Sequence, residues 1–104
     1  MLVINIMLSN LRREIELLGR HVLILDLVMS HEPVGIIKLS SMSGLPQHKV
    51  RYSLRVLEQR GLIKPSQQGA VATEEAKRYR EKLYSEVVEA RRDLEALLEK
   101  MTQV

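Results

Sequence analysis

Hydrophobic residues recur at spacings of three and four between residues 11 and 29, which places them on one side of a helix. Ser9 or Asn10 is placed to cap the start of this helix. Gly19 interrupts the stripe, and we expect a kink or a junction of two helices there. Pro33 then ends the helix, because proline cannot continue it. The stripe consists of Leu11, Ile15, Leu18, Val22, Leu25 and Met29.

The middle third of the chain predicts two helices around a tight turn. Residues 36–41 are typical of a short helix, and residues 41–46 of a turn in which Gly44 takes a positive φ angle. Proline at position 46 fits the first turn of the next helix, where its missing N–H does no harm. That helix is expected to run from Pro46 to Arg60 and to end at Gly61 in a left-handed conformation.

This helix has one apolar face and one polar face. Val50, Leu54 and Leu57 lie four and three residues apart, so their side chains are expected to point together into the core. The opposite face is polar and partly basic, as on a helix that presents a surface to a partner. It carries His48, Tyr52, Arg55 and Gln59, flanked by Lys49 and Arg51.

Two short apolar segments follow Gly61 and predict a β-hairpin. The sequence LIKP is expected to form one strand, SQQG the turn and AVAT the second strand. Thr73 is placed to cap the helix that follows, and Glu74 and Glu75 in its first turn favour the helix dipole.

The last helix carries a heptad seam about three repeats long. A helix of about thirty residues cannot bury its whole stripe against so small a domain. We therefore expect the far end to pack against a second copy in a homodimer. Pairing with the N-terminal helix of the same chain is the alternative. The seam consists of Leu83, Val87, Ala90, Leu94, Leu97 and Met101.

Positive charge is concentrated in the middle of the chain. The formal net charge is +3, and residues 31–73 hold six basic but only two acidic side chains. A localised basic patch attracts a polyanion by counterion release, although charge alone equally fits an ordinary solvated surface.

The predicted order is helix, short helix, turn, helix, hairpin and long helix, which is how a helix-turn-helix presents a helix to DNA. Residues 39–44 (LSSMSG), 50–63 (VRYSLRVLEQRGLI) and 71–79 (VATEEAKRY) carry this pattern. They resemble L-A-x-x-x-G, V-S-R-x-L-x-x-L-E-x-x-G-L-I and L-T-x-x-G of winged helix-turn-helix transcriptional regulators of the MarR and ArsR type. The resemblance covers roughly residues 20–80.

The resemblance implies a mainly α fold with a small β-hairpin, namely a winged helix-turn-helix domain with long terminal helices. Residues 1–18 would be an N-terminal helical extension for dimerisation, residues 19–73 the DNA-binding core, and residues 74–104 the C-terminal dimerisation helix. The implied function is that of a homodimeric, sequence-specific DNA-binding regulator of transcription.

Carried onto this chain, the resemblance makes the helix from Pro46 to Arg60 a recognition helix in the major groove. Arginine can donate two hydrogen bonds to a guanine edge, and glutamine can pair with adenine, whereas lysine suits phosphates. Many relatives place an arginine at the wing tip, where this chain has glutamines, so we expect wing contacts to be weak or confined to phosphates. Tyr52 could instead cover the domain's own surface. The expected DNA-binding residues are Gln47, His48, Lys49, Arg51, Tyr52, Arg55, Lys38, Lys64, Gln67 and Gln68.

Other chemistry has little support. His21, His31 and His48 fall on different elements without metal-ligand spacing, and Asp26 is expected to have a capping or surface role. No catalytic or nucleotide-binding motif is present, so we expect neither an enzyme nor a cofactor. The apolar start, MLVINIML, is too short to span a membrane. The chain has no cysteine, which is compatible with a reducing cytoplasm, and we expect a cytoplasmic protein.

Two other functions stay open from the residues. A winged-helix domain can also serve as a protein–protein interaction module in a transcription or replication assembly, because function lies in the site and not in the fold. A regulator of this kind can also sense a small molecule between its dimer helices, and the sequence neither supports nor excludes such an effector.

Overall fold

The computed structural model describes the backbone of residues 2–103 and the side chains of residues 6–103. The described chain is mainly helical, with four helices and one two-stranded antiparallel hairpin. In chain order the elements are α1 (Leu2–His31), α2 (Ile36–Ser43), α3 (Gln47–Gln59), β1 (Ile63–Ser66), β2 (Gly69–Ala72) and α4 (Glu74–Thr102).

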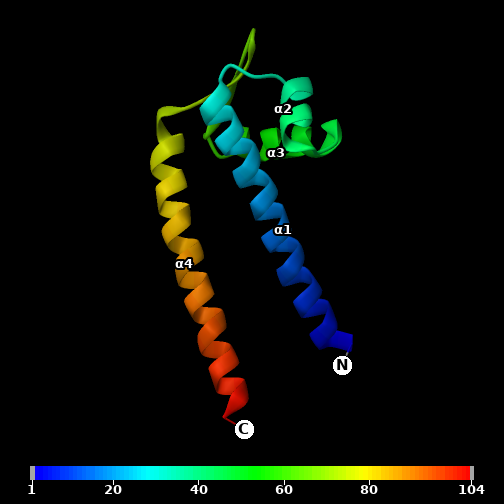
Figure 1. The fold of residues 1–104 in the computed structure, drawn as a ribbon, viewed down its shortest axis with the longest axis vertical. Helices are drawn as coiled ribbons and strands as arrows, with labels where there is room; N and C mark the ends of the chain where they lie inside the picture. Colours follow the sequence, from blue (N-terminus) through cyan, green and yellow to red (C-terminus); the bar gives the residue numbers. More distant parts are fainter. Residues whose placement is uncertain (1, 104) are drawn as a thin grey trace.

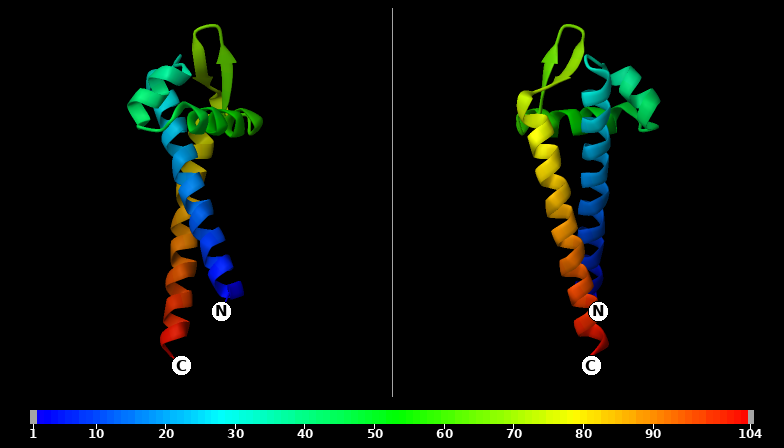
Figure 2. Two further views of the ribbon diagram at one scale, coloured as in Figure 1. Left: turned by 90° about the vertical axis from the view of Figure 1, so that its right-hand side faces the viewer. Right: turned by 60° about the vertical axis from the view of Figure 1, so that its left-hand side comes forward.

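The two long helices, α1 and α4, extend in the same direction from the rest of the molecule. The small helices α2 and α3 and the hairpin gather at one end, and α1 and α4 extend from them to the other end, where both termini lie (Figure 1). The same arrangement is visible from two further directions (Figure 2). The molecule is therefore elongated, with extents of 58 × 29 × 22 Å.

The hydrophobic core lies where the C-terminal half of α1 meets α2, α3 and the hairpin. Val50 and Leu57 of α3 are buried, and Leu54 packs partly buried against them, so the predicted inward face of this helix is confirmed. Of the described side chains, those of residues 6–16 in α1 and most of those in α4 contribute nothing to this core. The buried hydrophobic residues are Ile24, Leu25, Val28, Val34, Leu39, Val50, Leu57, Leu62, Ile63 and Ala76.

Helix α1 differs from its prediction at two points. It begins at Leu2, so Ser9 and Asn10 lie inside the helix and do not cap it. It also continues through Gly19 without a break, where a kink or junction was expected. Leucine, isoleucine and methionine on both sides favour the helix, and one interior glycine costs only about 1 kcal/mol. The predicted boundary after residue 18 therefore falls within a single helix.

The turns around α3 follow the glycine signals, although α2 runs to Ser43, two residues further than predicted. Gly44 has φ +74° and Gly61 has φ +73°, which is the left-handed conformation expected of both. Pro46 occupies the N-cap position of α3 and Arg60 the C-cap, one residue outside the helix at each end.

The hairpin has a two-residue turn at Gln67 and Gln68, with Ser66 paired to Gly69. On its other edge Ala70 exchanges two backbone hydrogen bonds with Val34, of 2.8 and 3.1 Å. Because Ala70 uses its polar groups there, the opposite residue, Pro65, sits where its missing N–H would face outward. Proline at that outer edge discourages further strand pairing.

The packing of the hairpin against Val34 requires glycine at position 69. Its φ angle is +131°, and a Cβ atom there would lie 2.5 Å from the backbone carbon of Val34. We predict that Gly69→Ala destabilises the fold by about 2–4 kcal/mol, from backbone strain and overpacking. Urea unfolding followed by circular dichroism at fixed protein concentration measures the change.

Gly19→Ala is the matched control for this substitution. A Cβ atom at Gly19 would meet nothing within 4 Å, and the residue lies inside a helix. Alanine there should stabilise the fold by about 0.5–1 kcal/mol. Equal effects of the two substitutions would show that the hairpin does not pack on Val34 as described.

Thr73 occupies the N-cap position of α4, as predicted, but its hydroxyl makes no capping hydrogen bond. Thr73 Oγ1 instead donates to the carbonyl oxygens of Gly61 and Leu62, at 2.7 and 3.2 Å. The hydroxyl therefore closes the base of the hairpin against the end of α3. Within the described residues, none of the helices combines the length and apolar character needed to cross a membrane.

Candidate nucleic-acid interface

The turn before α3 fixes where the N-terminus of that helix lies. The backbone N–H of Gly44 donates to Ser40, at 3.0 Å, and Ser40 Oγ donates to the carbonyl of Leu45 at 2.5 Å. Ser43 Oγ accepts the N–H of Leu45 at 3.1 Å. The serines of LSSMSG therefore bond the backbone of the tight turn and hold α2 and α3 at a set angle.

The outer face of α3 is exposed and polar, as its sequence pattern predicts. His48, Arg51 and Arg55 point away from the buried face of the helix, and Gln47 is exposed at its start. Lys49 lies at the border of the two faces and is half-buried. The core beneath holds the helix in place, so its guanidinium groups extend from a rigid support.

The basic residues of this region have no ion-pair partners in the described chain. Within the described part of the chain, none of the six basic residues between positions 31 and 73 forms an ion pair, whereas five arginines outside that segment do. In the described chain no carboxylate lies within ion-pair distance of these six groups, so they can contact a partner. The six are Lys38, Lys49, Arg51, Arg55, Arg60 and Lys64.

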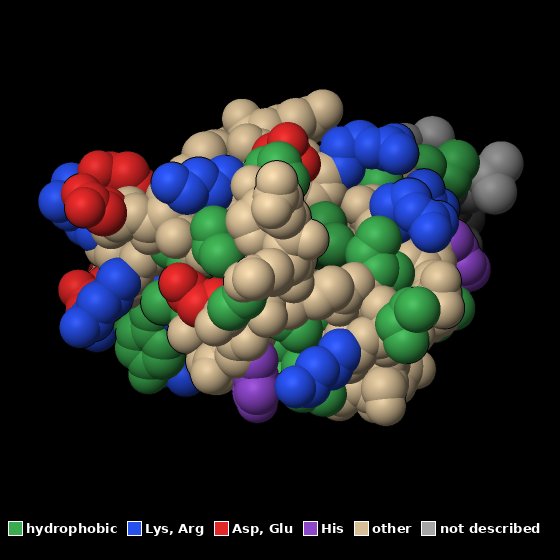
Figure 3. All heavy atoms as spheres, turned by 90° about the horizontal axis from the view of Figure 1, so that it is seen from above, with side chains coloured by type: hydrophobic (Ala, Val, Ile, Leu, Met, Phe, Trp, Pro, Cys, Tyr) green, Lys and Arg blue, Asp and Glu red, His purple; other side chains and the backbone are tan. Residues whose placement is uncertain are grey.

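Figure 3 views the molecule from the end that carries the hairpin. On the right of this view, lysine, arginine and histidine side chains can be seen without acidic ones among them. Glu58 is the one acidic residue of α3, and it is exposed. Acidic side chains appear near the hairpin and on the left, over the start of α4. The face formed by α2, α3 and the hairpin is therefore biased toward positive charge.

A groove of about 930 Å³ separates α2 and α3 from the hairpin. Lys38 of α2 and Lys64 of β1 line it, together with Glu58 near the end of α3. The hairpin residues Gln67 and Gln68 are exposed at its rim. All predicted lysine and glutamine contacts outside α3 thus border one groove beside that helix.

Tyr52 lies apart from this group, on the side of α3 that faces α1. Its ring centroid is 5.8 Å from that of His21, with the two planes tilted by 43°. The side chain is still 46% exposed. Tyr52 therefore partly covers the domain's own surface, which was the alternative, and also retains a free edge.

Sequence reasoning missed the polar contact beneath Tyr52. Ser53 is fully buried, and its Oγ lies 2.8 Å from Nδ1 of His21, so α1 and α3 share a partly buried hydrogen bond. A signal for Ser53 was present, because it lies three residues after Val50 and four before Leu57. Nothing in the spacing pointed to His21, which is 32 residues away.

The environment of His21 opposes its protonation. Burial lowers the pKa of the His21 imidazole below its usual value of 6.5, and the positive charges of Arg20 and Arg60 lower it further. Because the pKa of this imidazole is lower in the folded state, the unfolded chain binds the proton more readily than the folded protein does. His21 is therefore neutral in the folded protein near pH 7.

We predict that the free energy of unfolding decreases as the pH falls below about 6.5, because the unfolded chain then takes up a proton that folded His21 does not. The loss should be complete once the pH passes below the lowered pKa of the folded state. His21→Gln should reduce this dependence, whereas the control His48→Gln, at an exposed position of α3, should keep it. Denaturant unfolding between pH 5 and 8 makes the comparison, and equal behaviour of the two variants would contradict it.

A second exposed surface lies on the long helices. The far end of the predicted heptad seam is uncovered, with Leu94, Leu97 and Met101 exposed by 41%, 52% and 64%. Val87 and Ala90 are also exposed, and only Leu83 is half-buried. The alternative of pairing the whole seam with α1 of the same chain is therefore wrong beyond the first turns.

An apolar cleft of about 300 Å³ lies between the middle of α1 and the first half of α4. Ile15, Leu18 and Val22 form its α1 wall, and Tyr84 and Val87 are among the α4 residues opposite. The cleft continues the uncovered seam, so apolar surface extends along both long helices.

The described residues contain no group of three or more His, Cys, Asp and Glu side chains that could hold a metal ion. No model of a protein family matches the chain, and no curated protein matches it in sequence.

Proposed function

We propose that this protein is a homodimeric, sequence-specific DNA-binding regulator of transcription with a winged helix-turn-helix domain. In this proposal α2 and α3 form the helix-turn-helix, α3 enters the major groove, and the hairpin is the wing. The observation that carries it is a set of basic side chains, without ion-pair partners among the described residues, around the exposed face of a well-anchored helix.

The side chains of α3 suit the major groove. Arg51 and Arg55 project from its outer face, and each guanidinium can donate two hydrogen bonds to a guanine edge. Gln47 and His48 lie at the N-terminal end, which in this motif approaches the bases most closely. Tyr52 borders this face, and its free edge can contact the DNA backbone.

The lysines suit the phosphates on either side. Lys38, Lys49 and Lys64 come from three different elements and are free of ion pairs within the described chain. Phosphate contacts give affinity and fix the register of the protein without reading sequence. The glutamines at the hairpin tip carry no charge, so the wing supplies less of the electrostatic attraction than the helices.

Dimerisation follows from the uncovered seam and the adjoining cleft. Apolar side chains exposed over several turns of α4 gain most by packing against a second copy of the same helices. A two-fold dimer places two copies of α3 in successive major grooves. The half-sites of its operator would then lie about 34–36 Å apart.

Selection of bound duplexes from a random pool tests the proposal. We expect a palindromic consensus with half-sites one helical turn apart. Six lysine contacts in the dimer would give a plot of log affinity against log salt with a slope of about −5. A pool without enrichment, or binding indifferent to salt, would overturn the proposal.

A protein–protein interaction module is the second candidate. The observation that favours it is Ile37, which is 75% exposed at the start of α2 and lines the groove beside the hairpin. A protein ligand would bury this isoleucine, whereas DNA would not need it. Ile37→Ser should abolish binding of a purified stoichiometric partner under this candidate, and it should leave DNA affinity nearly unchanged under the leading proposal.

A further inference from the structure

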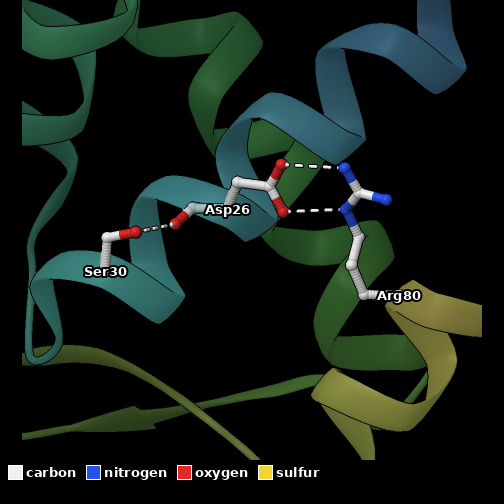
Figure 4. A network of polar contacts seen from close by, with 3 residues as sticks. All are labelled: Asp26, Ser30 and Arg80. Atoms are coloured by element: carbon white, nitrogen blue, oxygen red, sulfur yellow. Dashed lines mark hydrogen bonds and ion pairs between the residues drawn. The ribbon is translucent and has the colours of Figure 1, made fainter.

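Two side chains of α1, five residues apart, link this helix to two others. His21 shares the hydrogen bond with Ser53 of α3, and Asp26 accepts two hydrogen bonds from Arg80 of α4. Figure 4 shows the fork of Arg80 facing both carboxylate oxygens. Helix α1 is thus the element through which α3 and α4 are placed relative to each other.

The Asp26–Arg80 pair differs from the other ion pairs of the described chain. The other four ion pairs each join two residues that are three or four positions apart in one helix, whereas Asp26 and Arg80 are 54 residues apart. The contacts run from Nε to Oδ1 at 2.9 Å and from Nη2 to Oδ2 at 3.2 Å. Two parallel bonds to a planar guanidinium fix an orientation, which a single contact does not.

The pair lies where α4 leaves the core. Ala76 is buried, Tyr79 packs against the core and Leu83 is half-buried, but α4 is largely exposed beyond that point. The direction of the free part is therefore set within the first ten residues of the helix. Within those residues Arg80 makes the one polar side-chain contact to another element that the structure describes.

A change of angle at the base of α4 is amplified along the largely exposed part of the helix, residues 84–102. Residues 84–102 form a helix about 28 Å long. A tilt of about 7° at its base moves its end by about 3.4 Å, which is the rise of one base pair. Because both copies tilt in a two-fold dimer, such a change in the angle of α4 shifts the two recognition helices relative to each other by about one to two base pairs.

We propose that Asp26 and Arg80 are positioning residues that set the angle of α4 and so the half-site spacing which the dimer prefers. The inference rests on the proposed function, because spacing has meaning only for a DNA-binding dimer. Neither residue contacts DNA in this arrangement. Their loss should change which operators are preferred rather than how tightly one half-site is held.

Binding to a series of duplexes tests the spacing. The duplexes carry the selected half-sites at the preferred separation and at one or two base pairs more or less. Wild-type protein should prefer its best spacing by at least about fivefold over a shift of one base pair, a ratio that corresponds to about 1 kcal/mol. Arg80→Gln and Asp26→Asn should reduce this ratio toward one and leave affinity for a single half-site unchanged.

Arg78→Gln is the matched control. Arg78 lies on the same helix, two residues away, and its pair with Glu75 is exposed and within α4. This variant should keep the wild-type spacing preference. The same ratio in wild type and Arg80→Gln, or an equal loss in Arg78→Gln, would overturn the positioning role.

A measurement without DNA separates this inference from the proposed function. The chain has no cysteine, so spin labels can be placed at Asn10→Cys and Asp93→Cys, with excess unlabelled protein to isolate distances within one chain. Arg80→Gln should broaden or shift the distribution of distances between α1 and α4, and Arg78→Gln should not. An unchanged distribution would overturn the positioning role even if the protein binds DNA.

Failure of the wild type to bind any duplex would instead overturn the proposed function and the claim about spacing. A broadened distribution in Arg80→Gln would in that case still show that this pair sets the angle of α4.

Discussion

Replacing Arg51 and Arg55 together by alanine is expected to lower the affinity for the selected duplex by about a hundredfold or more. Both guanidinium groups project from the exposed face of α3 and have no ion-pair partner in the described chain. A base contact from arginine is typically worth about 1–3 kcal/mol, so the loss of two is large. Electrophoretic mobility shift or fluorescence anisotropy at fixed salt measures it.

The control for this variant removes the same amount of charge elsewhere. Arg91 and Arg92 are exposed on α4 and pair with Glu95 and Glu89. Their joint replacement by alanine should change DNA affinity by no more than a few fold. Circular dichroism should show that both double variants remain folded, since all four side chains are exposed. Equal losses in the two variants would mean that only net charge matters, and no loss in either would contradict a role for α3.

Replacing Leu94 and Leu97 together by glutamate is expected to convert the dimer into monomers. Both side chains are exposed in the single chain and lie on the seam that a second copy would cover. Two half-sites held by one dimer gain about 10²–10⁴ in affinity from linkage, and monomers lose this gain. Sedimentation velocity measures the mass, and binding to full and half operators measures the loss.

Ser85→Glu with Ala96→Glu is the matched control for the seam. Both positions are exposed and lie on the side of α4 opposite Leu94 and Leu97, so the added charge is the same but the seam is intact. This variant should remain dimeric and bind the full operator as the wild type does. A dimer that survives both glutamates in the seam would place the interface elsewhere.

Local signals predicted the middle of the chain well. The apolar spacing of Val50, Leu54 and Leu57 gave α3 and its buried face, and Gly44 and Gly61 gave the turns on either side. These features depend on a few neighbouring residues, so short-range propensity and periodicity are enough. The predicted polar face of α3 is likewise exposed in the structure.

Contacts between distant parts of the chain were not predictable. The bond from His21 to Ser53 and the pair of Asp26 and Arg80 span 32 and 54 residues, and no period in the sequence connects them. Asp26 was expected to have a capping or surface role, and its side chain is 45% exposed, but its pairing with Arg80 of α4 was not predicted. The angle between α1 and α4 depends on this pairing and on the packing at the core.

The start of α1 and the hydrogen bonds of the Thr73 hydroxyl were missed for a different reason. Residues that favour caps do not always cap, because their hydroxyl and amide groups can lie on a helix surface or bond another segment. Asn10 is exposed inside α1, and the hydroxyl of Thr73 bonds the end of α3 across the base of the hairpin. Such a residue can mark a helix start, as Thr73 does, without making the capping hydrogen bond.

Titration of ¹⁵N-labelled protein with the selected duplex, followed by amide chemical shifts, tests the central claim most directly. The largest shifts should fall on residues 47–55 of α3, on Lys38 and on the hairpin around Gln67, with little change beyond residue 90 in α4. Shifts confined to the long helices, or no shifts at all at saturating duplex, would show that this cationic face does not meet DNA.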